Sequence, residues 1–259
     1  MENINERKML GVIGGMGPEA TSYYYGNVIA HTDASCDQEH IDMVILSHAT
    51  MPDRSEAILT GDNKHLINLL CNDARRLEAL GVTNIAITCN TSHYFYDYIQ
   101  KAVNIPVINM IQESVAYAIR DYDNVKRVGI MATDGTINSK IYHKACRKEG
   151  VIPVELSEER QKDVMSLIYE DIKTGKLGDR RKFDRVVSEF MRKGCDVIIL
   201  ACTELSVFKG KHDVPSICLD AMDVLVKESI LRSGAKYKYR VESMAEMKSQ
   251  PLIENNCNF

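Results

Sequence analysis

The sequence predicts an α/β protein with two pseudo-symmetric, doubly wound domains, each with a central parallel sheet, and an active-site cleft between them. Apolar runs of strand length alternate with segments of helical spacing along most of the chain, a pattern typical of right-handed βαβ units and parallel sheets. Two of these runs, at 82–87 and 195–200, are followed within two residues by Cys89 and Cys202. Because ligands bind at the carboxyl ends of strands in such sheets, both thiols are candidate functional groups.

Matched features in the two halves of the chain indicate an internal duplication. Gly11 and Gly129 lie in the apolar runs that open the halves, and spans of 78 and 73 residues separate them from Cys89 and Cys202. The other matched features are the proline segments 104–109 and 213–218, the pair Gly17 and Gly135, and the pair Thr21 and Ser139. Repeated strand-then-polar patterns occur in many α/β proteins, but several features in the same order favour a duplication.

The first domain is expected to comprise residues 1–112 and about 217–235. Pro18 suits the first turn of a helix, and Gly81 suits the residue after a helix end. The expected elements are strand 10–13, a glycine turn at 14–18, a helix from Pro18, strand 42–47, loop 48–54, helix 63–80, strand 82–87, a helix containing Tyr94 and Ile99, a strand around Val107 and a final helix at 221–233.

The second domain is expected to comprise residues 113–216. Its elements repeat the alternation of the first half, beginning with the last turns of a helix at 111–121. They are strand 128–132, helix 137–149, strand 152–155, helices 159–174 and 180–193, and strand 197–201. Residues 236–259 lose periodicity, so we expect a C-terminal tail that is poorly ordered or packs outside the two domains.

The composition excludes several classes of protein. The chain of 259 residues is 45% hydrophobic and carries a net charge of −4 without a basic cluster, which argues against a nucleic-acid partner. No apolar run approaches the roughly 18–20 residues that span a bilayer, and the polar N-terminus lacks a secretory signal, so we expect a cytoplasmic protein without a membrane partner. The eight cysteines include no Cys-x-x-Cys pair, so neither a structural zinc site nor a disulfide framework is indicated.

Cys89 and Cys202 differ from the other six cysteines, which read as small buried hydrophobes. Each of the two stands between a strand and polar residues that can cap a helix, where the pKa of a thiol can fall by one or more units from about 8.5. A pair of thiols suits the inversion of a stereocentre. One thiolate removes a proton from one face of a carbon while the opposite thiol returns a proton to the other face.

Four further features are candidates for ligand binding. The glycine turn at 14–18 can bind an anion at a helix start, but it has neither G-x-G-x-x-G nor a P-loop, so a substrate carboxylate fits better than a nucleotide. Arg54 follows a strand and can grip a carboxylate with its planar guanidinium. His93 could belong to a Cys/His pair or a metal site, but we favour a polar helix residue near the cleft. By pattern alone Lys173 reads as an exposed lysine at a helix end.

Four motifs together resemble the aspartate/glutamate racemase family, and its aspartate racemase branch in particular. They are GGMGP at 14–18, PDRS at 52–55, CNTSH at 89–93 and CTEL at 202–205, and the resemblance extends from about residue 9 to 231. The resemblance implies an enzyme without cofactor, independent of pyridoxal phosphate, in which two cysteines alternate as proton acceptor and donor. It also implies two pseudo-symmetric α/β domains and a homodimer.

The resemblance further implies roles for individual residues. Cys89 and Cys202 correspond to the catalytic thiols, while Arg54 and Lys173 correspond to the residues that hold the carboxylates of the substrate. The remaining expected substrate-binding residues are Met16, Asn90, Thr91, Ser92 and Thr203. Since Met16 stands in a Met-Gly-Pro segment that replaces the Asp-Ser signature of glutamate racemases, aspartate is favoured as the substrate.

The expected activity is therefore the interconversion of L- and D-aspartate, with glutamate as a further substrate. Maleate isomerisation and hydantoin racemisation are alternatives, because related folds also use paired cysteines. A dicarboxylate sensor without catalysis is a third reading, but binding alone has no need of two opposed thiols. We expect no cofactor and no metal ion.

Overall fold

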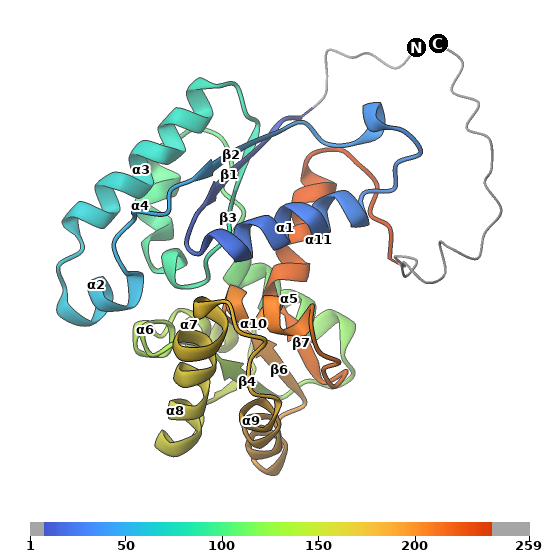
Figure 1. Ribbon diagram of the computed structural model, residues 1–259. Helices are drawn as coiled ribbons and strands as arrows, with labels where there is room; N and C mark the ends of the chain where they lie inside the picture. Colours follow the sequence, from blue (N-terminus) through green and yellow to red (C-terminus); the bar gives the residue numbers. More distant parts are fainter. Residues whose placement is uncertain (1–7, 240–259) are drawn as a thin grey trace.

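The first of two parallel sheets has the strand order β2-β1-β3 in the computed structural model, which describes residues 8–239 (Figure 1). Its strands are β1 (Leu10–Gly14), β2 (Met43–Ser47) and β3 (Asn84–Ile87). Leu10 lies opposite both Met43 and Asn84. The strand that we predicted around Val107 is reduced to a single parallel bridge with Ile85, on the far side of β3.

The second sheet repeats this order as β5-β4-β6-β7. Its strands are β4 (Arg127–Met131), β5 (Ile152–Val154), β6 (Val197–Leu200) and β7 (Cys218–Asp220), and β7 takes the place of the bridge at Val107. Gly11 pairs with Ile85 in the first sheet, and Gly129 pairs with Ile198 in the second. Each isoleucine precedes its cysteine by four residues, so the two thiols occupy equivalent positions in a repeated topology.

Helices of the first half cover both faces of its sheet. They are α1 (Pro18–His31), α2 (Arg54–Thr60), α3 (Lys64–Ala79), the 3-10 turn η3 (Thr91–Phe95) and α4 (Tyr96–Lys101). Figure 1 shows α3 and α4 on one face and α1 on the other. The predicted loop at 48–54 ends one residue early, and α2 begins at Arg54. The side chain of Asp53 caps this helix by accepting a hydrogen bond from the Glu56 N–H.

The second half departs from the prediction at two helices. Lys140 has a left-handed backbone (φ 57°), which divides the predicted helix 137–149 into α6 (Asp134–Ser139) and α7 (Ile141–Lys148). The predicted helix 159–174 begins as α8 (Glu158–Ser166) and ends in a π-helical turn η4 (Leu167–Asp171) and a 3-10 turn η5 (Ile172–Thr174). Two further helices follow, α9 (Arg180–Arg192) and the unpredicted α10 (Thr203–Lys209).

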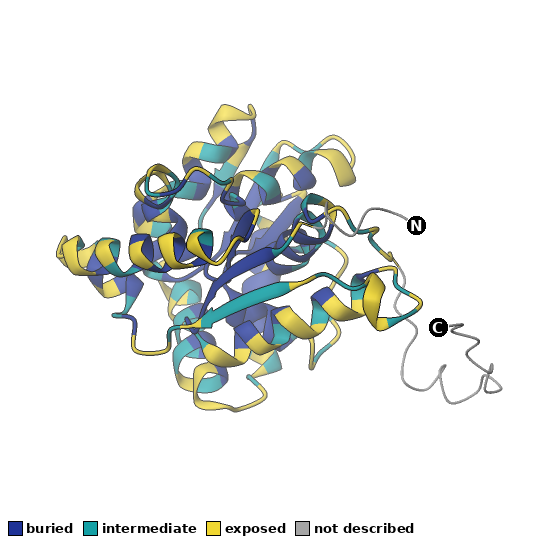
Figure 2. Ribbon diagram, turned by 90° about the horizontal axis from the view of Figure 1, so that it is seen from above, coloured by how far each residue is buried: buried dark blue, intermediate teal, exposed yellow. Residues whose placement is uncertain are grey.

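Alternation along the strands builds two apolar clusters. Leu10 and Val12 face the larger cluster, which is continuous with the core of the second half, whereas Ile13 faces the smaller cluster beneath α3. Figure 2 shows the central strands as buried and the outer faces of the helices as exposed. Only half-buried residues and one exposed residue occur along β2, as fits a strand at the edge of its sheet.

Two helices cross from one half of the protein to the other. The helix α5 (Met110–Asp121) follows the first sheet but packs against α7 and β6, while α11 (Ala221–Arg232) follows the second sheet but packs against α1 and β3. The two crossing helices also contact each other. We expected residues 217–235 to belong to the first domain. The structure divides them between the two halves, because β7 pairs within the second sheet whereas α11 covers the first.

The start of the predicted tail packs against the first half. Tyr237 forms an antiparallel bridge with Thr32, and the Lys238 N–H donates to the His31 carbonyl at 2.7 Å. The rest of the predicted tail, 240–259, lies outside the described residues. Between residues 8 and 239 no helix has both the length and the apolar character required to traverse a bilayer.

Gly129 allows α9 to approach the second sheet closely. A Cβ atom at this position would lie 2.7 Å from Cδ1 of Phe190, a ring that is fully buried. We expect Gly129→Ala to lower the free energy of unfolding by about 1–3 kcal/mol, because the buried ring has to shift. Gly26→Ala is the matched control: Gly26 lies in α1 with open space around its Cα, and we expect a gain of about 0.5–1 kcal/mol. Urea unfolding measures both, and equal stabilities would contradict the close approach.

Candidate active site

One pocket brings together the turn after β1, the start of α2, the ends of β3 and β6, and the turns η4 and η5. The pocket is small, with about 280 Å³ of empty space when the open solvent at its mouth is included. The lining residues are Met16, Asp53, Arg54, Ser55, Cys89, Asn90, Thr91, Thr133, Tyr169, Lys173, Cys202, Thr203 and Glu204. Both cysteines singled out in the sequence therefore face the same cavity.

Cys202 is the N-cap residue of α10, and its thiol is tied to a carboxylate. Its Sγ donates a hydrogen bond to Oε2 of Glu204 at 2.9 Å. Burial raises the pKa of Cys202 well above its usual value, the Glu204 carboxylate raises it further, and Lys173 opposes the change. The expectation that a helix N-terminus lowers this pKa is wrong for Cys202, because burial and a neighbouring anion outweigh the helix dipole. Cys202 is therefore a protonated thiol at neutral pH.

Arg54 places a buried cation beside the other thiol. Its Nη1 donates to the carbonyls of Met51 at 3.2 Å and Pro52 at 2.9 Å, whereas its buried Nε has no hydrogen-bond partner among the residues that the structure describes. Burial works against the charged form, but interaction with Cys89 and Asp53 leaves the pKa of Arg54 raised. The guanidinium thus remains charged and keeps unused donor capacity at the wall of the pocket.

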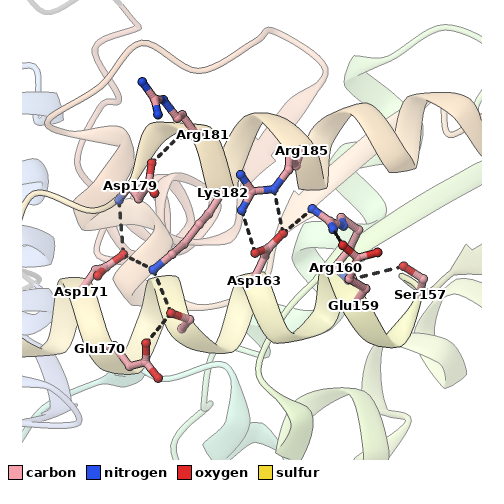
Figure 3. Close-up of polar contacts among 11 residues, drawn as sticks. Ser157, Glu159, Arg160, Asp163, Glu170, Asp171, Asp179, Arg181, Lys182 and Arg185 are labelled. Atoms are coloured by element: carbon pink, nitrogen blue, oxygen red, sulfur yellow. Dashed lines mark hydrogen bonds and ion pairs between the residues drawn. The ribbon is translucent and has the colours of Figure 1, made fainter.

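Lys173 is an exposed residue at a helix end, as its local pattern suggested, and it also lines the pocket from η5. Its Nζ lies 3.7 Å from Oε1 of Glu204 and 4.5 Å from the centre of the Tyr169 ring. Burial lowers the pKa of Lys173, but the Glu204 carboxylate and Cys202 more than compensate, so the pKa is raised. Lys182 of α9 anchors the preceding turn through a 2.9 Å ion pair with Asp171 (Figure 3).

The other predicted residues fall into two groups. Met16, Asn90, Thr91 and Thr203 line the pocket as expected. Ser92 does not line it, since its hydroxyl lies behind the wall and donates to Sδ of Met16 at 3.4 Å.

His93 supports the Cys89 segment instead of facing the cavity. Its Nε2 accepts the Met110 N–H at 3.2 Å, which leaves the proton on Nδ1 to be donated to the Cys89 carbonyl at 2.9 Å. Burial lowers the pKa of His93, so the ring is neutral. Between residues 8 and 239 no three His, Cys, Asp or Glu side chains converge in the way a metal ion requires.

A chain of hydroxyl groups crosses from the first half to the second at the pocket wall. Thr91 contacts Thr136 at 2.8 Å and Thr133 at 3.3 Å, and Ser55 donates to Thr133 at 3.3 Å. Tyr169 completes the chain by donating to Ser55 at 3.4 Å. These contacts fix the width of the cleft at the level of the thiols.

Several lining residues escaped the sequence analysis. Glu204 was visible in the second cysteine motif, and Asp53 and Ser55 flank Arg54, so their neighbours carried a usable signal. Thr133 and Tyr169 had no such signal, because only the folding of the second half brings them to the cleft.

The family model described as Asp/Glu/Hydantoin racemase matches residues 13–229 of the chain. The chain belongs to this racemase family. The racemase is similar to the broad-specificity amino-acid racemase RacX of Bacillus subtilis, with 26% identity over 226 residues, 86% of this chain and 96% of RacX.

Solved structures agree with this membership. The aspartate racemase of Picrophilus torridus is 28% identical, with a TM-score of 0.76 over 89% of this chain and 96% of that one. A glutamate racemase of Campylobacter jejuni, at 17% identity and a TM-score of 0.58, covers 90% and 89% of the two chains and shows the shared fold. The protein is thus an isomerase, an amino-acid racemase with the two-domain α/β fold of its relatives.

The contact between Cys202 and Glu204 predicts a change in thiol titration. We expect Glu204→Gln to let the Cys202 thiolate form at lower pH than in the unaltered racemase, since burial remains but the adjacent negative charge is lost. The ultraviolet absorbance of thiolate, recorded against pH, measures the change. The same substitution in a Cys202→Ala background is the control, and a shift that persists there would contradict the assignment.

Proposed function

We propose that this racemase interconverts L- and D-aspartate, with glutamate as a further substrate, by a two-base mechanism that needs no pyridoxal phosphate. The observation that carries the proposal is that Cys89 and Cys202 line a single small pocket from equivalent strand ends of two repeated halves. Two thiols approached from opposite halves suit proton exchange on the two faces of one carbon.

The charges around the pocket favour a dicarboxylic amino acid. Arg54 and Lys173 supply two cations, and the unpaired Nε of Arg54 can still donate to a carboxylate. Glu204 and Asp53 supply acceptors, one of which suits the substrate ammonium group. An uncharged hydantoin ring makes no use of two cations, and this favours aspartate over the hydantoin alternative.

In the proposed reaction one proton leaves the substrate and another enters it. When Cys89 acts as the base, its thiolate takes the Cα proton while Arg54 stabilises the negative charge beside it. Cys202 then donates its thiol proton to the opposite face of Cα, which leaves a thiolate at Cys202 and a thiol at Cys89. The reverse reaction starts from that state, so the two directions use the same atoms.

Racemisation, followed by the incorporation of solvent deuterium at Cα, tests this chemistry. We expect Cys89→Ala and Cys202→Ala each to lower racemisation of both aspartate enantiomers at least about 100-fold, because each variant lacks one of the two proton carriers. Cys71→Ala is the control, since Cys71 is buried in α3 outside the pocket. Near-full activity of either active-site variant would refute the mechanism.

A substrate panel separates the proposed activity from its alternatives. We expect turnover of aspartate, and slower turnover of glutamate, by protein free of metal and pyridoxal phosphate. Turnover of maleate or a substituted hydantoin without either amino acid would point to the other activities. We also propose a homodimer, as the resemblance implies, and a cytoplasmic location, which sedimentation and cell fractionation would test.

A further inference from the structure

Asn90 lines the pocket and carries a donor that no residue between 8 and 239 satisfies. The residue is 2% exposed, yet its Nδ2 has no hydrogen-bond partner within the described part of the chain. A buried amide group without a partner is costly, so a site that keeps one is prepared for a ligand acceptor. Under the proposed function, on which this inference rests, that acceptor is a carboxylate oxygen of the amino acid.

The other end of the Asn90 amide is held by a tyrosine from the second half. Tyr142, in α7, is fully buried and donates its hydroxyl proton to Oδ1 of Asn90 at 2.6 Å. Burial raises the pKa of Tyr142, so its hydroxyl remains protonated. A donor fixed on Oδ1 leaves Nδ2 as the part of the amide that is free to face a ligand.

The internal duplication supplies a tyrosine for comparison. The overlay that pairs Gly11 with Gly129 also pairs Tyr24 with Tyr142, and both tyrosines are fully buried. Tyr24 donates its hydroxyl proton to Oγ of Ser229 in α11, also at 2.6 Å. The two equivalent hydroxyls therefore make bonds of the same length, but only that of Tyr142 ends on a residue of the pocket.

We propose that Tyr142 is a positioning residue for substrate binding, which holds the Asn90 amide so that its N–H donors, rather than its carbonyl, are presented to a carboxylate of the substrate. Because Asn90 follows β3 and Tyr142 lies in α7, the amide takes this orientation only when the two halves are packed together. The packing of the halves and the binding of the carboxylate are thereby coupled through one hydrogen bond.

The test compares Tyr142→Phe with Tyr24→Phe in the full-length protein. We expect Tyr142→Phe to raise KM for L-aspartate about tenfold with little change in kcat, since an amide that is free to rotate loses one oriented hydrogen bond to a charged group. The dissociation constant of succinate, measured by calorimetry, should rise by the same factor. Tyr24→Phe should leave KM and succinate binding unchanged, and thermal unfolding shows how far each lost hydrogen bond affects stability alone.

A double substitution separates positioning from general damage. In an Asn90→Ala background, Tyr142→Phe should have no further effect on succinate binding, because the amide it orients is absent. Equal behaviour of the two tyrosine variants, or an undiminished effect of Tyr142→Phe without Asn90, would overturn the inference and leave the proposed function standing. An unaltered protein that neither racemises aspartate nor binds succinate would overturn the proposed function and the assignment of the amide to a substrate carboxylate.

Discussion

The reciprocal exchange of α5 and α11 is the constraint on which the rest of the structure depends. Each helix leaves the sheet that precedes it and packs against the other half, and the two helices meet between the halves. One apolar cluster therefore runs from β1 through both crossing helices into the second sheet. Because the halves share this core, the strand ends that carry the two cysteines are held at a fixed separation. A hinge between independently folded domains would not give that precision.

Within this frame the two thiols lie in opposite electrostatic surroundings. Cys89 faces the Arg54 guanidinium, whereas Cys202 hydrogen-bonds to the Glu204 carboxylate. The repeated topology alone would give the thiols equivalent environments. The difference arises from side chains that do not obey the duplication, because Arg54 comes from α2 and Glu204 lies two residues after Cys202. In the proposed mechanism the carboxylate favours the protonated form of Cys202, which suits that thiol as the proton donor.

The sequence predicted the parts of the site that depend on short-range pattern. Both cysteines end apolar runs, and Arg54 follows a strand, so their places at the carboxyl edge of a parallel sheet followed from elementary rules. The raised pKa of Cys202 did not follow, since it depends on burial and on the rotamer of Glu204. The local pattern of Lys173 correctly indicated an exposed residue but not its place at the pocket, because the turn that carries it is stabilised by the distant Lys182. The predicted domain bounds placed the helix at 221–233 with the first half and most of the helix at 111–121 with the second, and α11 and α5 pack in this way.

The distribution of charge suggests how a site without a cofactor can remove a weakly acidic proton. In the proposed reaction the negative charge moves from a thiolate to the substrate carbon and then to the opposite sulfur, so the total charge of the pocket does not change. Arg54 interacts with Cys89 and Lys173 with Cys202, so a cation lies near each end of that path. Glu204 resists formation of the Cys202 thiolate, but the same resistance makes that thiolate a stronger base when the reaction runs backwards. The buried carboxylate therefore suits a reaction in which each direction regenerates the starting state of the other.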